Sequence, residues 1–388
     1  MNATHDLIRP DRQASIAGDD HSSCRRPAAR RTKIICTLGP ATADLDTLRD
    51  LVAAGMDVAR FNFSHGSHDF HRRLVQLLRQ AAAELERPVA LMQDLQGQKL
   101  RIGTLPGGGV DLTEGEAASL RWGTRSDDPK IVPVPHVGLL RALRPFDRVL
   151  FGDGEIELSV RSTGEAAADC EVVRGGRLGE RKGISVPGRW FPMPVLSRQD
   201  LDDIAFGHSI GFDFLAVSFV RTAQDVKAVR MVTRELGWPV QLVAKLETRE
   251  AMWDLELILD EADAVMVARG DLAVQLSIAE VPVAQKTVIR SANNAGVPVI
   301  TATQMLESMV RSAVPTRAEA TDVANAVWDG TDAVMLSAET SSGEHPVDAV
   351  RAISELCFAA ERNDMWRRGA GAGWFGQFGV LETVGAEA

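Results

Sequence analysis

Four short apolar runs, QLVAK (241–245), AVMVA (264–268), VITAT (299–303) and AVML (333–336), recur across residues 241–336. Each run is followed by a stretch with helical apolar spacing, at 248–261, 278–295, 316–328 and 346–360. Short apolar runs that alternate with amphipathic stretches are typical of strand–helix units on a parallel sheet. The second half of the chain therefore predicts four such units in succession.

The first half of the chain carries the same pattern. Its apolar runs are at 32–38, 57–63, 89–94 and 214–218, and its helical stretches are at 44–54, 69–85, 199–209 and 223–236. Thr222 and Thr248 stand where a helix N-cap is expected, and Gly55, Gly237 and Gly296 stand where helices should stop. Eight strand–helix units predict an α/β fold, a (β/α)8 TIM barrel.

Residues 98–186 interrupt this pattern, because Gly and Pro become frequent and no long helical stretch occurs. Short strands are expected at 148–151, 155–160 and 169–173, so the segment reads as a small β-barrel-like domain inserted after strand three. Without this domain, residues 32–97 and 187–360 remain. Their combined length is close to the roughly 250 residues of one barrel. Residues 1–31 are expected to form a disordered tail, and residues 361–388 a C-terminal tail.

The composition narrows the class of protein. The chain has 388 residues, 45% hydrophobic and 25% charged, which is typical of a folded globular protein. A net charge of −10 disfavours non-specific nucleic-acid binding. No apolar stretch is long enough to span a membrane. The four cysteines form no CxxC pair, which argues against a zinc site or a disulfide framework and favours a reducing cytoplasm.

The active site of a (β/α)8 barrel lies at the carboxyl ends of its strands. The polar residues that follow the predicted strands are therefore candidates for the site. They are Arg60, Asn62, Ser64 and His65 after strand two, Asp94, Lys99 and Arg101 after strand three, Lys245 and Glu247 after strand five, Arg269, Gly270 and Asp271 after strand six, Thr303 after strand seven, and Ser337 and Glu339 after strand eight.

These residue types favour one kind of chemistry. Glu247 and Asp271 suit a hard divalent cation such as Mg²⁺, which prefers one or two carboxylates plus substrate oxygens and water. Arg60, Lys245, Arg101 and Lys182 suit phosphate or carboxylate groups. A metal with cationic clamps is what phosphoryl transfer requires. Taken singly, Arg60 is equally consistent with a surface ion pair, His65 with a turn, and Glu247 and Asp271 with carboxylates at helix N-termini.

Several longer segments resemble the pyruvate kinase family. They are TKIICTLGP (32–40), GMDVARFNFSHG (55–66), VARGDL (267–272), ATQMLESM (302–309) and PTRAEATDVANAVWDGTDAVMLSAET (315–340). Phe61 stands where the family usually has leucine. The resemblance covers about residues 32–360, and segments of this length are far more specific than a short pattern.

The resemblance implies roles for individual residues. Lys245 is expected to stabilise the transferring phosphoryl group and the developing enolate, and Glu247 and Asp271 to ligate Mg²⁺ or Mn²⁺. The expected substrate ligands are Arg60, Lys245, Arg269, Gly270, Asp271 and Thr303. Among them, the backbone at Arg269 and Gly270 and the Thr303 hydroxyl are expected to hold the substrate carboxylate. Thr303, Ser337 and Glu339 are expected on the path that protonates the enolate. Five residues are expected to face the nucleotide phosphates. They are Arg60 and the four residues assigned to nucleotide binding, Asn62, His65, Arg101 and Lys182.

A monovalent-cation site is implied at Asn62, Ser64, Asp94 and the carbonyl of Leu95. Family members with lysine at the position of Lys99 tend to be independent of K⁺. The Lys99 ammonium is therefore expected to reach this pocket and to replace the ion.

The resemblance leads to a function: transfer of a phosphoryl group from phosphoenolpyruvate to ADP, giving pyruvate and ATP in cytoplasmic glycolysis. The inserted domain is expected to close as a lid, and the barrels to pair as a homodimer. The family's C-terminal regulatory domain is expected to be absent. Two alternatives remain: a metal-dependent lyase acting on a pyruvate enolate, and a non-catalytic relative that binds metabolites.

Overall fold

Eight parallel strands close into a barrel in the computed structural model, which describes residues 30–152, 154–189 and 193–362. The strands are hydrogen-bonded in the order β1-β16-β15-β14-β13-β12-β3-β2. Their bounds are β1 Lys33–Leu38, β2 Val58–Asn62, β3 Ala90–Asp94, β12 Phe214–Val220, β13 Gln241–Leu246, β14 Ala264–Ala268, β15 Val299–Ala302 and β16 Ala333–Leu336. The predicted (β/α)8 barrel is confirmed.

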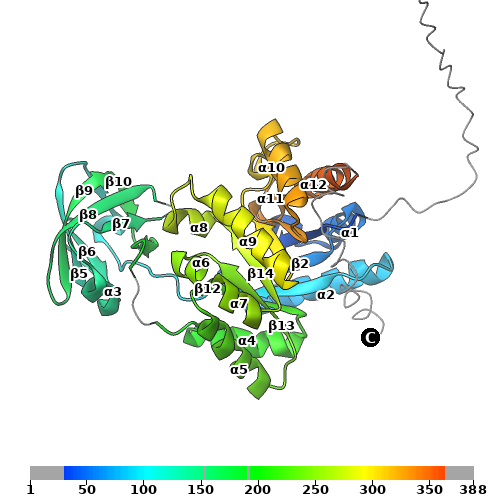
Figure 1. Ribbon diagram of the computed structural model, residues 1–388, viewed down its shortest axis with the longest axis horizontal. Coiled ribbons are helices and arrows are strands. Elements are labelled where there is room, and N and C mark those ends of the chain that lie inside the picture. The colour runs from blue at the N-terminus through cyan, green and yellow to red at the C-terminus, as the bar shows by residue number, and fades with distance from the viewer. Residues whose placement is uncertain (1–29, 153, 190–192, 363–388) are drawn as a thin grey trace, which may run out of the picture.

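Helices surround the barrel (Figure 1). They are α1 Leu45–Ala54, α2 His68–Glu84, α4 Arg198–Ile210, α5 Ala223–Glu235, α6 Arg249–Trp253, α7 Leu255–Glu261, α8 Arg269–Gln275, α9 Val281–Ala295, α10 Arg317–Asp329, α11 Ala338–Ser341 and α12 Pro346–Glu361, with short 3-10 turns η1 Pro40–Thr42 and η3 Glu307–Val310. Thr248 caps α6 as predicted, since its hydroxyl accepts a hydrogen bond from the Ala251 N–H. Gly296 ends α9 at φ 70°.

The helix expected at 248–261 is divided in two. Asp254 has φ −100° and ψ 14°, so the helical path breaks between α6 and α7. The Asp254 carboxylate accepts a hydrogen bond from the backbone N–H of Ala223, at the start of α5, at 2.7 Å. This tertiary contact fixes the break, and nothing in the local sequence indicates it.

Two apolar layers hold the barrel together. The interior of the barrel is filled by buried side chains from its strands, among them Ile35, Met92, Met266 and Met335. A larger layer lies between the strands and the surrounding helices. Because strand residues alternate between these two layers, nearly every position of the strands is buried, and the strands read as continuous apolar runs.

Four aspartates repeat at the N-terminal rim of the barrel, each one residue before β2, β12, β14 or β16. The carboxylate of each accepts a hydrogen bond from a backbone N–H of the preceding barrel strand, at 2.7–2.9 Å: Asp57 from Ile34, Asp213 from Leu91, Asp263 from Leu242 and Asp332 from Val299. Asp57 and Asp263 also pair with Arg30 and Arg230. No cation pairs with Asp332 among the described residues.

The inserted segment forms a separate layer at one side of the barrel, at the left of Figure 1. Its elements are η2 Pro106–Gly108, β4 Gly109–Leu112, β5 Ala117–Trp122, β6 Ile131–Val134, α3 Val137–Ala142, β7 Arg148–Phe151, β8 Ile156–Thr163, β9 Ala167–Arg174, β10 Gly176–Gly179 and β11 Ile184–Ser185. It consists of a six-stranded sheet and a two-stranded one, and it has its own buried core. We call this segment the lid.

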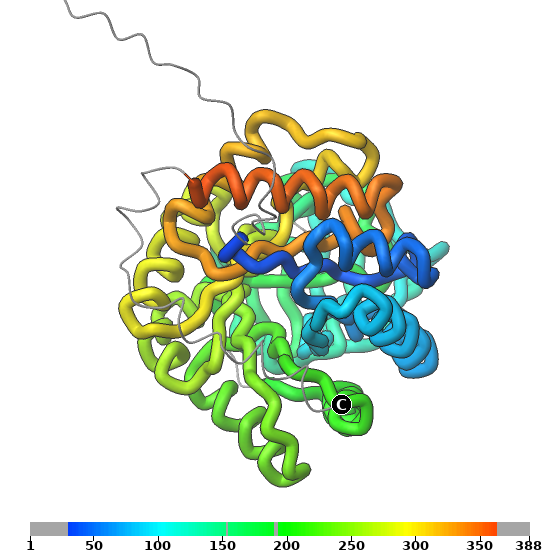
Figure 2. Tube along the Cα trace, turned by 90° about the vertical axis from the view of Figure 1, so that its right-hand side faces the viewer, coloured from blue at the N-terminus to red at the C-terminus, as the bar shows by residue number. Residues whose placement is uncertain are grey.

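The first and last α-helices of the described residues lie side by side outside the barrel strands. In Figure 2, α12 in orange-red lies beside α1 in blue, and the two are in contact. The Glu361 carboxylate, at the end of α12, accepts hydrogen bonds from the backbone N–H groups of Arg31 and Thr32. The tails expected at 1–31 and 361–388 otherwise lie outside the described residues. None of the helices described here is both long enough and apolar enough to traverse a bilayer.

Candidate active site

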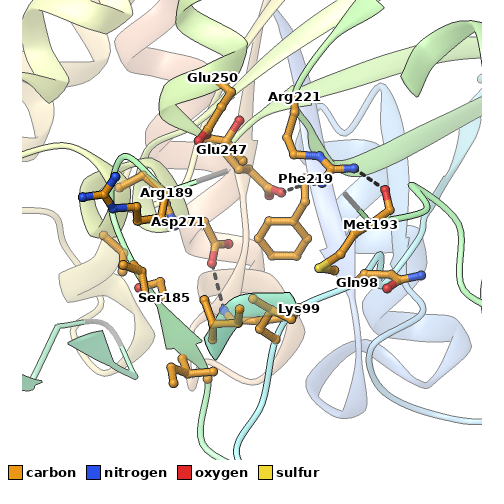
Figure 3. Close-up of a pocket in the computed structure, with 18 of the residues that line it drawn as sticks. Gln98, Lys99, Ser185, Arg189, Met193, Phe219, Arg221, Glu247, Glu250 and Asp271 are labelled. Atoms are coloured by element: carbon orange, nitrogen blue, oxygen red, sulfur yellow. Dashed lines mark hydrogen bonds and ion pairs between the residues drawn. The ribbon is translucent and has the colours of Figure 1, made fainter. Parts of the chain in front are cut away.

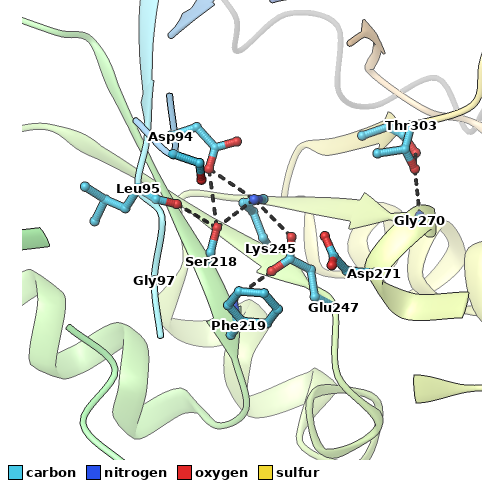
Figure 4. A network of polar contacts seen from close by, with 12 residues as sticks. Asp94, Leu95, Gly97, Ser218, Phe219, Lys245, Glu247, Gly270, Asp271 and Thr303 are labelled. Atoms are coloured by element: carbon cyan, nitrogen blue, oxygen red, sulfur yellow. Dashed lines mark hydrogen bonds and ion pairs between the residues drawn. The ribbon is translucent and has the colours of Figure 1, made fainter. Parts of the chain in front are cut away.

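Lys245 lies at the centre of a buried polar cluster at the carboxyl ends of the barrel strands (Figure 4). Its ammonium is 3.0 Å from Asp94 Oδ1, 2.9 Å from Glu247 Oε1 and 2.7 Å from the Ser218 hydroxyl. Burial lowers the pKa of Lys245, but Asp94 and Glu247 outweigh it, so the pKa lies above its usual value. The side chain is therefore a fixed positive charge with little access to water.

Asp94 joins two cations at the end of β3. Its second carboxylate oxygen accepts a hydrogen bond from Arg60 Nε at 2.6 Å, and Arg60 Nη1 donates to the Thr37 hydroxyl at 2.8 Å. Burial raises the pKa of Asp94. The positive charges of Lys245 and Arg60 lower this pKa by more than burial raises it, so the net shift is downward. The Arg60 side chain is thus anchored within the barrel, in the same network as Lys245.

Glu247 and Asp271 follow neighbouring strands and form the carboxylate pair predicted for a divalent cation. Glu247 is fully buried, and its second oxygen accepts a hydrogen bond from the Phe219 N–H at 2.8 Å. Burial raises the pKa of Glu247, and the nearby Asp271 charge adds to the rise. A divalent cation would relieve this repulsion. Two carboxylates on neighbouring strands fit Mg²⁺, which binds one or two protein carboxylates and keeps water and substrate oxygens as its other ligands.

The position of Lys99 differs from the expectation. Its ammonium contacts Asp271 Oδ1 at 2.8 Å, and it does not reach the predicted monovalent-cation pocket at Asp94. Asp94 is already occupied by two buried cations, whereas Asp271 is one-third exposed and has no other cationic partner among the described residues. After β3 the chain turns at Gly97, with φ 63°, and this turn carries Lys99 toward Asp271.

Thr303 meets the start of α8 at the opposite side of the site. Its hydroxyl accepts a hydrogen bond from the Gly270 N–H at 2.8 Å and donates to the Ala302 carbonyl at 2.6 Å. Thr303 and Gln304 both have left-handed backbone, with φ 66° and 53°. This conformation costs a residue other than glycine about 1–2 kcal/mol, so other contacts must hold the loop in place.

Arg269 was expected to meet the substrate carboxylate through its backbone, and its side chain points away from the site. The guanidinium is buried and donates to the carbonyls of Thr303 and Gln304 and to Asp322. These partners use its donors, so only the backbone of this residue remains for a substrate.

Glu339 braces the two loops that follow β15 and β16. It is fully buried, and its two oxygens accept hydrogen bonds from the N–H groups of Leu306 and Ser337, at 3.1 and 2.7 Å. The Ser337 hydroxyl is buried and has no hydrogen-bond partner within the described part of the chain. Ser337 therefore presents a polar atom that a water molecule or a substrate group can satisfy.

The residues predicted to bind nucleotide are spread between barrel and lid. The side-chain oxygen of Asn62, Oδ1, accepts a hydrogen bond from the Ser64 N–H at 3.1 Å, and Ser64 and His65 are exposed on the loop after β2. Arg101 donates to a backbone carbonyl at 3.1 Å, and Lys182 pairs with Glu155 at 3.0 Å, both within the lid. These two cations are therefore separate from the Lys245 cluster.

Sequence reasoning missed Ser218 and Phe219. The Ser218 hydroxyl, which lies 2.7 Å from the Lys245 ammonium, also donates to the Leu95 carbonyl at 2.8 Å, the atom expected to ligate a monovalent cation. Ser218 is the last residue of the predicted fourth strand, so the rule that selects strand ends should have included it. Phe219 has φ 56°, and a register shift in β12 accompanies it. No pattern in the sequence indicates that conformation.

A cleft between lid and barrel opens onto the carboxylate pair (Figure 3). Arg221 Nη2 donates to the Met193 carbonyl at 2.6 Å, and Arg189 forms two hydrogen bonds with Asp147, so both edges of the cleft are tied to the segment that links lid and barrel. Residues that line it include Gln98, Lys99, Ser185, Arg189, Phe219, Arg221, Glu247, Glu250 and Asp271.

These features define a (β/α)8 barrel with an inserted domain beside a cleft that contains cations and a pair of carboxylates. A family model described as "Pyruvate kinase, barrel domain" matches residues 29–350. The chain belongs to the pyruvate kinase family, as its motifs predicted.

Curated relatives agree with this assignment. The chain is 43% identical over 343 residues to "Pyruvate kinase 2" of Synechocystis sp., a match that covers 87% of this chain and 58% of that protein. It is 46% identical over 334 residues to "Pyruvate kinase" of Mycobacterium tuberculosis, covering 86% and 71% of the two chains. The "Pyruvate kinase" of Corynebacterium glutamicum is 45% identical over 332 residues, covering 86% and 70%.

Proposed function

We propose that this protein transfers a phosphoryl group from phosphoenolpyruvate to ADP, giving pyruvate and ATP in cytoplasmic glycolysis. The observation that carries the proposal is the buried Lys245 ammonium beside the Glu247–Asp271 carboxylate pair. A substrate that carries both a phosphate and a carboxylate needs a fixed cation and a divalent-metal site within reach of one another. This arrangement supplies both groups.

Glu247 and Asp271 would hold Mg²⁺, or Mn²⁺ in its place. When bound, the ion would neutralise negative charge on the phosphate and carboxylate oxygens of the substrate. Lys99 would give up its ion pair with Asp271 to the metal ion, because both are cations attracted to the same carboxylate.

Lys245 stabilises the developing enolate and the transferring phosphoryl group, since its position inside the barrel makes the charge more effective than in water. The Gly270 N–H and the Thr303 hydroxyl would exchange their present hydrogen bonds for bonds to the substrate carboxylate. Thr303, Ser337 and Glu339 lead a proton to the enolate carbon, through a water at the Ser337 hydroxyl, which has no partner in the described part of the chain.

Arg60, Asn62 and His65 face the nucleotide from the barrel, and Arg101 and Lys182 face it from the lid. Closure of the lid brings the two sets together and excludes water, so that the phosphoryl group reaches ADP. Lys182 then exchanges Glu155 for a phosphate oxygen, which is the stronger partner in a closed site.

The test is an assay of the purified chain with phosphoenolpyruvate, ADP and Mg²⁺, in which lactate dehydrogenase reports pyruvate and luciferase reports ATP. We expect equal amounts of pyruvate and ATP, and a loss of both in Lys245→Met. Lys286→Met is the matched control, because Lys286 lies at the exposed surface and, within the described ranges, forms its ion pair with Asp329.

Two outcomes would overturn the proposal. Pyruvate that forms without ATP would indicate a lyase. Binding of phosphoenolpyruvate without turnover, in wild type and Lys286→Met alike, would indicate a non-catalytic metabolite-binding protein.

A further inference from the structure

The buried guanidinium of Arg269 gathers the loop that carries Thr303. Its Nη2 donates to the Thr303 carbonyl at 2.6 Å and to the Gln304 carbonyl at 3.0 Å, and its Nε lies 3.1 Å from the same Thr303 carbonyl. A weaker contact from Nε reaches the Ala302 carbonyl at 3.3 Å. One side chain thus binds three successive carbonyls at the end of β15.

These contacts explain how two successive residues other than glycine remain in left-handed backbone. Thr303 is β-branched, so its φ of 66° is strongly disfavoured unless neighbouring groups impose it. Extended backbone at Thr303 would turn its carbonyl away from Arg269 and its hydroxyl away from the Gly270 N–H. The hydrogen bond in Figure 4 between Gly270 and Thr303 therefore depends on the guanidinium behind the loop.

Arg269 is itself held by two helices. Asp322 of α10 accepts a hydrogen bond from Nη1 at 2.6 Å, and Gln285 of α9 accepts a second at 3.3 Å. With these contacts, the planar guanidinium is fixed in one orientation. Asp322 is about one-third exposed and lies behind the loop, with Arg269 between it and Thr303.

We propose that Arg269 and Asp322 are positioning residues that set the conformation of Thr303, and through it the hydroxyl that binds substrate and leads the proton to the enolate. This inference rests on the proposed function for the role of Thr303. The conformational part stands on the contacts alone. Because Arg269 precedes Gly270 and Asp271 directly, the same residue also fixes the start of α8 relative to Thr303.

The main variant is Asp322→Asn, which keeps the size of the side chain and removes the charge that orients Arg269. We expect kcat/KM for phosphoenolpyruvate to fall about tenfold, with a higher KM for phosphoenolpyruvate and an unchanged KM for ADP. A merely structural role would lower the amount of active enzyme and leave both KM values unchanged. Asp329→Asn is the matched control on the same helix, since Asp329 pairs with the exposed Lys286.

Rescue gives a second readout. Glycine adopts positive φ without strain, so Gln304→Gly in the Asp322→Asn background should recover at least threefold of the lost kcat/KM. Gln304→Ala in that background removes the same side chain and should recover nothing. The ¹³Cα and ¹³Cβ shifts of Thr303, which report backbone conformation without substrate, should move toward extended values in Asp322→Asn and Arg269→Lys.

The outcomes separate the two proposals. A wild-type chain without kinase activity would overturn the proposed function, while the Thr303 shifts would still decide whether Asp322 sets the loop. An active wild type with unchanged Thr303 shifts and an unchanged KM for phosphoenolpyruvate in Asp322→Asn would overturn the positioning role.

Discussion

Replacing Asp332 by asparagine should stabilise the barrel at neutral and alkaline pH. Asp332 lies at the N-terminal rim, only 7% exposed, and its carboxylate accepts one hydrogen bond, from the Val299 N–H. Burial raises its pKa from 3.8 to about 7, and the hydrogen bond offsets only part of that rise. An asparagine oxygen can accept the same hydrogen bond without carrying a charge.

The size of the effect follows from proton linkage. A carboxyl whose pKa is higher in the folded than in the unfolded chain contributes stability below the unfolded value, and this contribution is lost as pH rises through the folded value. At about 1.4 kcal/mol per pH unit, the difference between 3.8 and about 7 is about 4 kcal/mol at alkaline pH. About half of this, about 2 kcal/mol, should be lost between pH 5.5 and pH 8.

The assay is urea unfolding of wild type and Asp332→Asn at several values from pH 5.5 to pH 8. We expect the difference in free energy of unfolding to grow with pH in favour of the variant. Asp263→Asn is the matched control, because Asp263 has the same place in another repeat but pairs with Arg230 at 3.0 Å. That variant should lose stability at every pH. Parallel pH curves for wild type and Asp332→Asn would refute the reasoning, since Asp332 would then titrate alike in both states.

Four further predictions concern the site and its support. Lys245→Met should lower kcat by at least a hundredfold, because it removes a buried charge from the reacting groups; steady-state kinetics with more than a tenth of wild-type kcat would contradict this. Initial rates should stay within about twofold when K⁺ is replaced by a tetraalkylammonium salt at the same ionic strength, because Arg60 and Lys245 already neutralise Asp94. A tenfold activation by K⁺ would contradict this prediction. Lys99→Met should tighten Mn²⁺ binding about two- to fivefold in the absence of substrate, because the metal no longer competes with Lys99 for Asp271, and an exposed ion pair is worth up to about 1 kcal/mol. Electron paramagnetic resonance measures the affinity. An unchanged affinity would mean that the ion pair with Asp271 has no effect on metal binding. Gly207→Ala should lower the free energy of unfolding of the barrel by about 1–3 kcal/mol, because the new methyl group would clash with the buried Gln93 amide. Gly179→Ala is the control, since the space around Gly179 is open, and it should change the unfolding midpoint little.

The barrel could be predicted from sequence because its strands are buried on both faces. Each predicted run overlaps an observed strand, as at 264–268 and 333–336. The lid could also be predicted from the sequence, since its strands are short and separated by glycines. The break at Asp254 was not, because it depends on a hydrogen bond to Ala223, which is distant in sequence.

The candidate site was predicted in part. The rule that strand ends form the site placed Lys245, Asp94 and Glu247 together, and the structure joins them directly. The same rule cannot say where long side chains point. Lys99 was assigned to the cation pocket and instead pairs with Asp271. Arg269 was assigned a backbone role only, and nothing in the sequence indicated that its side chain binds the Thr303 carbonyl.

The sequence by itself determined the order of strands and helices and the types of charged residue at the rim, because burial patterns and residue identities are local properties of the chain. Only the tertiary structure decided which charges pair, that no cation of the described residues lies beside Asp332, and that Arg269 holds Thr303 at positive φ. The physical reason is distance: hydrogen bonds and buried ion pairs require partners within about 3 Å, and here those partners are brought together from separate strands by the closure of the barrel.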